Sequence, residues 1–229
     1  MENPELPKVN ELSVPIRLLP SRRTHWGDSL EIQHQRVKNL VEMVQKIGRH
    51  LKESKGLDHW DYYTEEVILS KLNNPHSFTY VVYVGDKPAA TFTLTKIRHD
   101  YESESGLNNI QFDNKPAYYL SMFGVLPEFQ SRSGFKGIGS GVLQQMEKLI
   151  SYAAKSEGFD TFIIRFDARL EYSALIQFYE KNGYQVLKDS NGEPLLITKA
   201  ASENYVLIEK LVYISAPPMP YQEYHLPNK

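Results

Sequence analysis

The sequence of 229 residues contains no cysteine, and this absence removes several kinds of chemistry from consideration. Structural disulfides, thiolate metal sites and covalent intermediates on a thiol are all excluded. The seven histidines are scattered and show neither the HExxH pattern nor a comparable ligand spacing. We therefore expect no metal site.

Long apolar runs and a strong excess of one charge are also missing. No segment is apolar over the length needed to span a bilayer. The formal net charge is -2 and the isoelectric point is near 6.4, so neither nucleic acid nor a membrane surface is expected as a partner. The chain begins MENPELPK, with acidic residues and prolines where a secretion signal would carry positive charge and then an apolar core. We expect a cytoplasmic protein.

Hydrophobic periodicity and turn residues predict an α/β protein with a mixed sheet, in a single domain over 1–229. A core at about 78–213 would follow an N-terminal strand and helices in 1–75 and precede a proline-rich tail in 214–229. Helices are expected at 28–51, at 64–72, from Ile138 to just before Gly158, and at 172–182. Strands are expected at 12–19, 78–84, 89–97, 118–125, 161–166, 184–187 and 205–213.

Residues that favour helix ends support these boundaries. Asp28 and Glu31 fit a capping box, Thr64 is a good N-cap, and Gly158 and Gly183 suit the residue after a helix. Apolar residues also recur at helical spacing. In the first helix these are Val37, Leu40, Val41, Val44, Ile47 and Leu51, and in the third Ile138, Val142, Met146, Leu149, Ile150 and Ala153.

The most informative segment is a glycine-rich loop between the strand that breaks at Pro127 and the helix that begins at Ile138. Glycines let backbone N–H groups approach an anion closely, and the start of a helix adds unpaired N–H groups and the positive end of a dipole. The loop therefore predicts a phosphorylated ligand. Its glycines are Gly134, Gly137, Gly139 and Gly141.

The spacing of these glycines fits neither of two familiar phosphate loops. In G-x-x-x-x-G-K-[ST], Gly139 should be followed by lysine, but Ser140 stands there. In G-x-G-x-x-G, Gly137 and Gly139 need a third glycine where Val142 stands. What remains is a G-x-G loop preceded by Lys136, and a nucleotide-binding module that merely shares such a loop stays an open alternative.

The loop resembles that of the GNAT superfamily of acyl-CoA N-acyltransferases, whose pattern is [RQ]-x-x-G-x-[GA]. A second resemblance is FYEKNGY at Phe178 to Tyr184, which is similar to the helix-end signature of that superfamily. Two positions depart from the pattern, because Gly134 stands at the Arg/Gln position and Tyr172 at a position where asparagine often contacts the cofactor. The resemblance implies a GNAT-like, mostly antiparallel sheet flanked by helices, and transfer of an acetyl or short acyl group from acyl-CoA to a primary amine by direct attack.

The resemblance also implies which residues bind acetyl-CoA. The glycine loop wraps the pyrophosphate, and the strand before it hydrogen-bonds the pantetheine arm and faces the acyl carbonyl. The implied residues are Phe123, Gly124 and Val125 in the strand, and Arg132, Gly134, Phe135, Lys136, Gly137, Ile138, Gly139 and Ser140 in the loop and helix start. For Gly124, a bulge, a close approach by the ligand, or simple relief of crowding all stay open.

By the same resemblance, Tyr179 of the helix-end motif lies near the cofactor sulfur and is the candidate general acid, although a packing role is the alternative. Asp167, after the apolar strand 161–166, is the candidate base, with capping of a turn or pairing with Arg165 or Arg169 as alternatives. A base acting through water is also open.

The sequence does not identify the amine acceptor, which could be a small molecule or a peptide. An acidic loop at 99–115 could attract a cationic amine or simply be solvated. A homodimer is an open possibility. The alternative to an enzyme is a non-catalytic module that binds or senses acyl-CoA, which the two departures from the family pattern favour.

Overall fold

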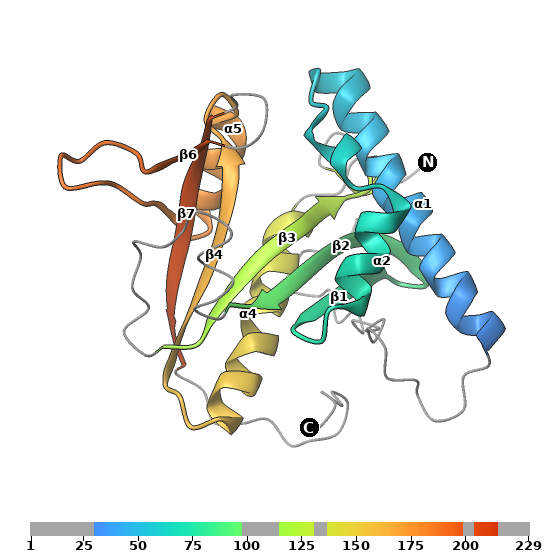
Figure 1. Ribbon diagram of the computed structural model, residues 1–229, viewed down its shortest axis with the longest axis horizontal. Helices are drawn as coiled ribbons and strands as arrows, with labels where there is room; N and C mark the ends of the chain where they lie inside the picture. The colour runs from blue at the N-terminus through green and yellow to red at the C-terminus, as the bar shows by residue number, and fades with distance from the viewer. Residues whose placement is uncertain (1–29, 98–114, 131–136, 199–203, 215–229) are drawn as a thin grey trace, which may run out of the picture. The chain divides into compact units, whose positions relative to one another are not determined.

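The computed structural model describes residues 30–97, 115–130, 137–198 and 204–214 (Figure 1). The expected strand at 12–19, residue Asp28 of the capping box, nearly all of the 99–115 loop and the tail lie outside these ranges. The helices are α1 (Leu30–Lys55), η2 (His59–Tyr62), α2 (Glu65–Asn73), η3 (Pro127–Phe129), α4 (Ile138–Ser156) and α5 (Ser173–Lys181). The strands are β1 (Ser77–Val84), β2 (Lys87–Lys96), β3 (Ala117–Val125), β4 (Thr161–Arg169), β5 (Gln185–Val186), β6 (Leu196–Thr198) and β7 (Asn204–Tyr213).

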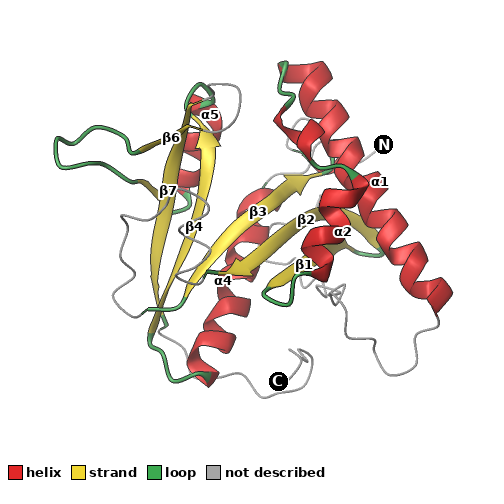
Figure 2. Cartoon of the chain, viewed as in Figure 1, coloured by secondary structure: helices red, strands yellow, loops and turns green. Residues whose placement is uncertain are grey.

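The strands form one mixed sheet in the order β1-β2-β3-β4-β7-β5, with β6 paired to β7. Figure 2 draws the strands in yellow and the helices in red. The pair β3 and β4 is parallel, whereas β7 is antiparallel to β4, β5 and β6. This confirms the expected mostly antiparallel sheet flanked by helices.

Two predicted boundaries were wrong, one because of a distant strand partner and one because of a nearby glycine. The strand expected to end at Phe166 runs on to Arg169, since its ladder with β7 continues to the pair of Arg169 and Tyr205. The first helix continues past Leu51 to Lys55 and stops before Gly56, whose φ is 68°. Asp167 therefore lies inside a strand and not after it. The short strand β6 was not expected at all.

The chain divides into two compact units, one made of 1–94 and 121–144, the other of 95–120 and 145–229. Strand β3 contributes its first half to the second unit and its second half to the first, whereas α4 contributes its first part, 138–144, to the first unit and the remainder to the second. The expected single domain over 1–229 stays a prediction.

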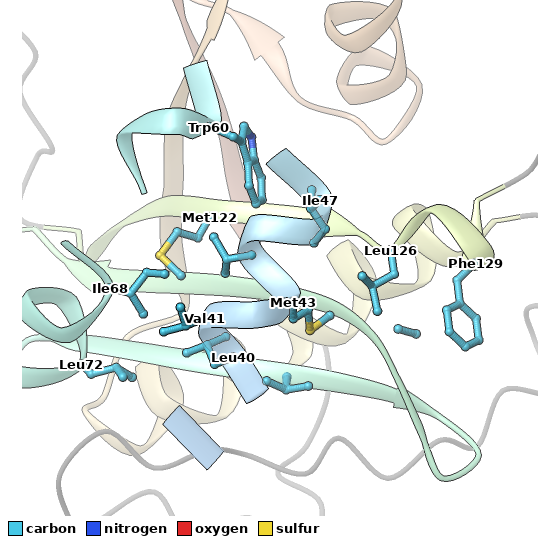
Figure 3. Packing of buried hydrophobic residues seen from close by; sticks show 13 residues of the cluster. Leu40, Val41, Met43, Ile47, Trp60, Ile68, Leu72, Met122, Leu126 and Phe129 are labelled. Carbon is cyan, nitrogen blue, oxygen red and sulfur yellow. The ribbon is translucent and has the colours of Figure 1, made fainter. Parts of the chain in front are cut away.

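In the first unit, α1 and α2 pack on strands β1 to β3 through one apolar cluster (Figure 3). Trp60 of η2 fills the space between two glycines: a Cβ on Gly48 of α1 would lie 3.2 Å from the Trp60 Cβ, and one on Gly124 of β3 would lie 2.6 Å from its ring. The expected apolar face of α1 is confirmed. The buried members of the cluster are Leu40, Val41, Met43, Val44, Ile47, Trp60, Ile68, Leu72, Val81, Ala89, Met122, Leu126 and Phe129.

The second unit is built on β4 and β7, which pair along their whole length. Phe166 of β4 packs against Tyr179 of α5 and against Tyr184, with ring centroids 4.3 and 5.3 Å apart. Helix α5 ends as predicted before Gly183, whose φ is 82°. There the Tyr184 N–H donates to the Tyr179 carbonyl at 3.1 Å, and the Gly183 N–H donates to the Glu180 carbonyl at 2.9 Å, the paired bonds of a glycine helix stop.

In α4 the expected apolar positions are buried with one exception. Ala153 is only partly buried, whereas its neighbour Ala154 is fully buried. The helix ends as predicted before Gly158, whose φ is 88°.

Candidate active site

The start of α4 presents backbone N–H groups without an acidic side chain beside them. Gly137 has a φ of 78°, and its carbonyl accepts the first hydrogen bond of the helix from the Gly141 N–H at 2.8 Å. The N–H groups of Ile138, Gly139 and Ser140 therefore have no acceptor within the helix. The first turn of α4 carries no acidic side chain. These donors and the positive end of the helix dipole fit the pyrophosphate of coenzyme A.

The orientation of this first turn is fixed by the core. Ile138 and Val142 are buried, while Gly139 and Ser140 between them are partly exposed. The apolar side of α4 thus packs inward, and the small residues are left on the accessible side. Arg132, Gly134, Phe135 and Lys136, which were also expected to contact the cofactor, lie outside the described residues.

The second half of β3 is irregular. Met122 has a φ of 51°, a left-handed conformation that a residue with a long side chain rarely adopts. The three residues that follow it, Phe123, Gly124 and Val125, are partly exposed. The Val125 carbonyl accepts a hydrogen bond from the Gln130 side chain at 2.9 Å, which ties the end of the strand to the residue before the glycine loop.

The structure gives a reason for glycine at position 124, which the sequence left open. Because a Cβ there would lie 2.6 Å from Trp60 and 3.0 Å from the side chain of Ile47, the glycine makes room for the core of the first unit. This supports relief of crowding by the absent side chain. The backbone of Gly124 is still partly exposed, so contact with a cofactor stays a prediction.

Tyr179 lies at the end of α5 with only 6% of its surface exposed. Its ring contacts Phe166, Phe178 and Tyr184, at centroid distances of 4.3, 5.2 and 6.0 Å. Tyr179 therefore has the packing role that was weighed as an alternative. Such packing also fixes the position of its hydroxyl, as a general acid requires, and its catalytic role stays a prediction.

Asp167 is partly buried in β4 and accepts a hydrogen bond from the hydroxyl of Tyr119 on the neighbouring strand β3. The strand register explains this contact. Tyr119 lies opposite Arg165, and Arg165 is two residues before Asp167, so the side chains of all three are on the same face of the sheet. Sequence reasoning missed Tyr119. Side chains alternate between the two faces of a sheet along each strand. This alternation places Tyr119 and Asp167 on the same face only when the register of the two strands is known.

The two arginines that were considered as partners of Asp167 also contact other groups. Arg165 is fully buried and forms an ion pair with Glu209 of β7, its Nε lying 2.9 Å from the carboxylate. Arg169 donates to the hydroxyls of Tyr205 at 3.3 Å and Tyr172 at 3.2 Å. Tyr172, at the position where the superfamily often has asparagine, is the residue before α5 and contacts this arginine.

A second polar cluster went unnoticed in the sequence. Glu147 of α4 accepts hydrogen bonds from Tyr184 at 3.0 Å and from Lys210 of β7 at 2.7 Å. Lys210 also donates to the Asn182 carbonyl at 2.9 Å. Burial raises the pKa of Tyr184 well above its ordinary value of 10.0, and the negative charge of Glu147 adds to the effect. The cluster fastens α4, the end of α5 and β7 together.

Within the described ranges, no group of three or more His, Asp or Glu side chains could hold a metal ion. None of the helices that the structure describes is long and apolar enough to cross a membrane.

One protein-family model matches more than half of the chain. Residues 42–184 match the model of the Acetyltransferase (GNAT) family. Comparison with curated proteins gives no match.

Several solved acetyltransferase structures are similar to this chain, and one with a TM-score above 0.5 supports the fold. A GNAT family acetyltransferase from Listeria monocytogenes is 20% identical, with a TM-score of 0.51 over 78% of this chain and 90% of that one. An acetyltransferase from Thermus thermophilus is 12% identical, with a TM-score of 0.47 over 77% and 92%. NAA60 from Arabidopsis thaliana, in complex with acetyl-CoA, is 10% identical, with a TM-score of 0.47 over 75% and 94%.

Proposed function

This chain belongs to the GNAT acetyltransferase family, and from that premise we propose that it transfers an acetyl or short acyl group from acyl-CoA to a primary amine of a small molecule or peptide. The observation that carries the proposal is the start of α4, where Gly137 turns the chain and three N–H groups have no acceptor within the helix. This helix start lies within the segment matched by the family model.

Two segments of the first unit would bind different parts of the cofactor. The N–H groups of Ile138, Gly139 and Ser140 would hold the pyrophosphate, since they add the dipole of α4 to direct hydrogen bonds. The backbone of Phe123, Gly124 and Val125 would hydrogen-bond the pantetheine arm. Arg132, Gly134, Phe135 and Lys136 complete the proposed loop by resemblance to the family.

The chemistry requires two proton movements. When bound, acetyl-CoA supplies an acyl group that is already activated as a thioester. The amine loses a proton as its nitrogen forms the new bond to carbon, and the sulfur gains one as its bond to carbon breaks. Asp167 would accept the first proton, directly or through water, and Tyr179 would donate the second. With no cysteine in the chain, a thiol of the protein cannot carry the acyl group, which favours direct attack.

Mass spectrometry of pooled small amines and peptides, incubated with the purified protein and acetyl-CoA, tests this proposal. We expect at least one acetylated product, with release of one CoA thiol for each acetyl group transferred. Asp167→Asn should flatten the dependence of turnover on pH if the carboxylate is the base. An acetyl-CoA complex that modifies no amine in a broad panel would contradict the proposed reaction and favour a sensing module.

The location and assembly of the protein are further parts of the proposal. A cytoplasmic enzyme would meet both acetyl-CoA and small amines, and gel filtration with light scattering would determine whether it forms a homodimer.

A further inference from the structure

The irregularity of β3 is a β-bulge. Two backbone hydrogen bonds link β2 and β3 near their ends: the N–H of Ile97, the residue after β2, donates to the Ala117 carbonyl, and the N–H of Leu126, the residue after β3, donates to the Ala89 carbonyl, each at 2.8 Å. The bonds are eight residues apart along the segment from Ala89 to Ile97 but nine apart along the segment from Ala117 to Leu126. One extra residue must therefore be accommodated between them. The positive φ of Met122 indicates where.

Met122 needs outside support to keep this conformation. Its φ of 51° makes it the one non-glycine residue with a positive φ in the described ranges, and its side chain is buried. A left-handed conformation is unfavourable for such a residue and persists only where its surroundings impose it. A bulge also takes a backbone N–H out of the regular ladder, so that group has to find another acceptor.

The acceptor is the hydroxyl of Tyr63, the residue that follows η2. The Met122 N–H donates to it at 3.3 Å. Tyr63 is itself held in place, because its ring meets Trp60 edge to face at a centroid distance of 5.3 Å and its N–H donates to the Trp60 carbonyl at 3.0 Å. The buried hydroxyl of Thr93 contacts the Met122 sulfur at 3.8 Å from the opposite strand.

We propose that Tyr63 is a positioning residue for cofactor binding: its hydroxyl holds the Met122 bulge and so aims the backbone of Phe123, Gly124 and Val125. This inference rests on the proposed function, because those three residues are the ones assigned to the pantetheine arm. The bulge lies directly before them, so a change in its φ would redirect their N–H and carbonyl groups. Misplacement by about 1 Å is enough to cost a binding or catalytic contact.

Tyr63→Phe tests the proposal, because it removes the hydroxyl and keeps the ring on Trp60. Calorimetry should show that acetyl-CoA binds about five- to tenfold more weakly, the effect of one lost neutral hydrogen bond. Adenosine 3′,5′-bisphosphate, which lacks the pantetheine arm, should bind the variant and the wild type equally. The exchange of the Met122 amide hydrogen, followed by NMR, should become faster in the variant.

Tyr62→Phe is the matched control, since the neighbouring Tyr62 is 66% exposed and contacts the ring of Tyr63 but is not assigned to binding. This control should change neither the affinity for either ligand nor the exchange of the Met122 amide hydrogen. Unchanged acetyl-CoA affinity in Tyr63→Phe, or equal weakening of both ligands, would overturn the positioning role. If the wild type bound no acyl-CoA at all, the proposed function itself would fail, while the amide exchange would still report whether Tyr63 holds the bulge.

Discussion

Tyr179 has to meet two requirements with one side chain. Its ring is part of the packing between α5 and β4, while its hydroxyl is the proposed proton donor. The two roles can be separated experimentally because phenylalanine keeps the first and removes the second. The same reasoning applies to Tyr184, whose hydroxyl binds Glu147 and has no proposed part in catalysis.

We expect Tyr179→Phe to lower turnover by about ten- to a thousandfold, the usual range for a positioned acid, and to leave the affinity for acetyl-CoA nearly unchanged. Steady-state kinetics with any acceptor found by mass spectrometry, together with calorimetry, would measure both. Tyr184→Phe is the control and should retain turnover. Full activity of Tyr179→Phe would leave this tyrosine with packing as its role.

Tyr184 should make the stability of the fold sensitive to alkaline pH. Burial and the Glu147 carboxylate raise its pKa in the folded state above the ordinary value of 10.0. Below pH 10 the tyrosine is protonated in both states and its contribution to stability is complete. Above pH 10 the unfolded chain releases the proton more readily, so the free energy of unfolding should fall as pH rises.

Urea denaturation between pH 8 and 11 would measure this fall in the free energy of unfolding, because that range includes the ordinary tyrosine pKa of about 10. Tyr184→Phe cannot ionise at this position and should lose stability less steeply over the same range. Tyr118, whose pKa burial also raises, is expected to account for part of the slope that remains. Identical slopes in the two proteins would contradict the assignment.

At the scale of elements, the start of α4 can be altered in charge without altering the helix. We expect Gly139→Asp to weaken acetyl-CoA binding by about a hundredfold or more, because it brings negative charge and bulk toward the proposed pyrophosphate position. The same carboxylate favours the positive end of the helix dipole, so the free energy of unfolding should not fall.

Gly139→Ala separates the effect of bulk from the effect of charge, because it adds a methyl group without charge. It should weaken acetyl-CoA binding less than Gly139→Asp does. Calorimetry would give the affinities and thermal unfolding the stability. If Gly139→Asp bound acetyl-CoA as the wild type does, the first turn of α4 would not be the phosphate site.

The packing of η2 against β3 gives a second prediction for an element. Gly124→Ala should destabilise the protein by about 1 to 3 kcal/mol, because its Cβ would lie 2.6 Å from the Trp60 ring and overpack the core. Chemical denaturation would measure the change. In a Trp60→Leu background the same substitution should cost less, since the smaller side chain leaves room for the methyl group. An equal cost in both backgrounds would show that Trp60 is not the obstacle.

At the scale of the whole molecule, the choice of ligand distinguishes an acyl-CoA enzyme from a nucleotide-binding module. The loop lacks the lysine of an ATP loop and the third glycine of a dinucleotide loop. Saturating CoA or acetyl-CoA should therefore raise the melting temperature, and ATP or NAD should not. At one hundred times its Kd, a ligand adds about 2.7 kcal/mol to the free energy of unfolding. The reverse order of ligands would overturn the proposed cofactor.

Much of the fold could be predicted because its signals lie within a few residues of one another. The apolar spacing of α1 places Leu40, Val44 and Ile47 on one side of a helix wherever that helix packs. Gly158 and Gly183 end helices because only glycine takes a left-handed conformation at low cost. The G-x-G loop and the motif at Phe178 to Tyr184 are equally local, and the family followed from them.

What the tertiary structure decided depends on pairs of residues far apart in the chain. Tyr119 reaches Asp167 across 48 positions, and Arg165 reaches Glu209 across 44. A shift of one residue in the register would have sent each side chain to the opposite face of the sheet, and no local pattern fixes that register. The bulge at Met122, its support by Tyr63 and the place of Trp60 beside Gly124 arise in the same way. Local sequence thus determined most of the elements and the glycine-rich loop, whereas strand register and core packing decided which side chains meet.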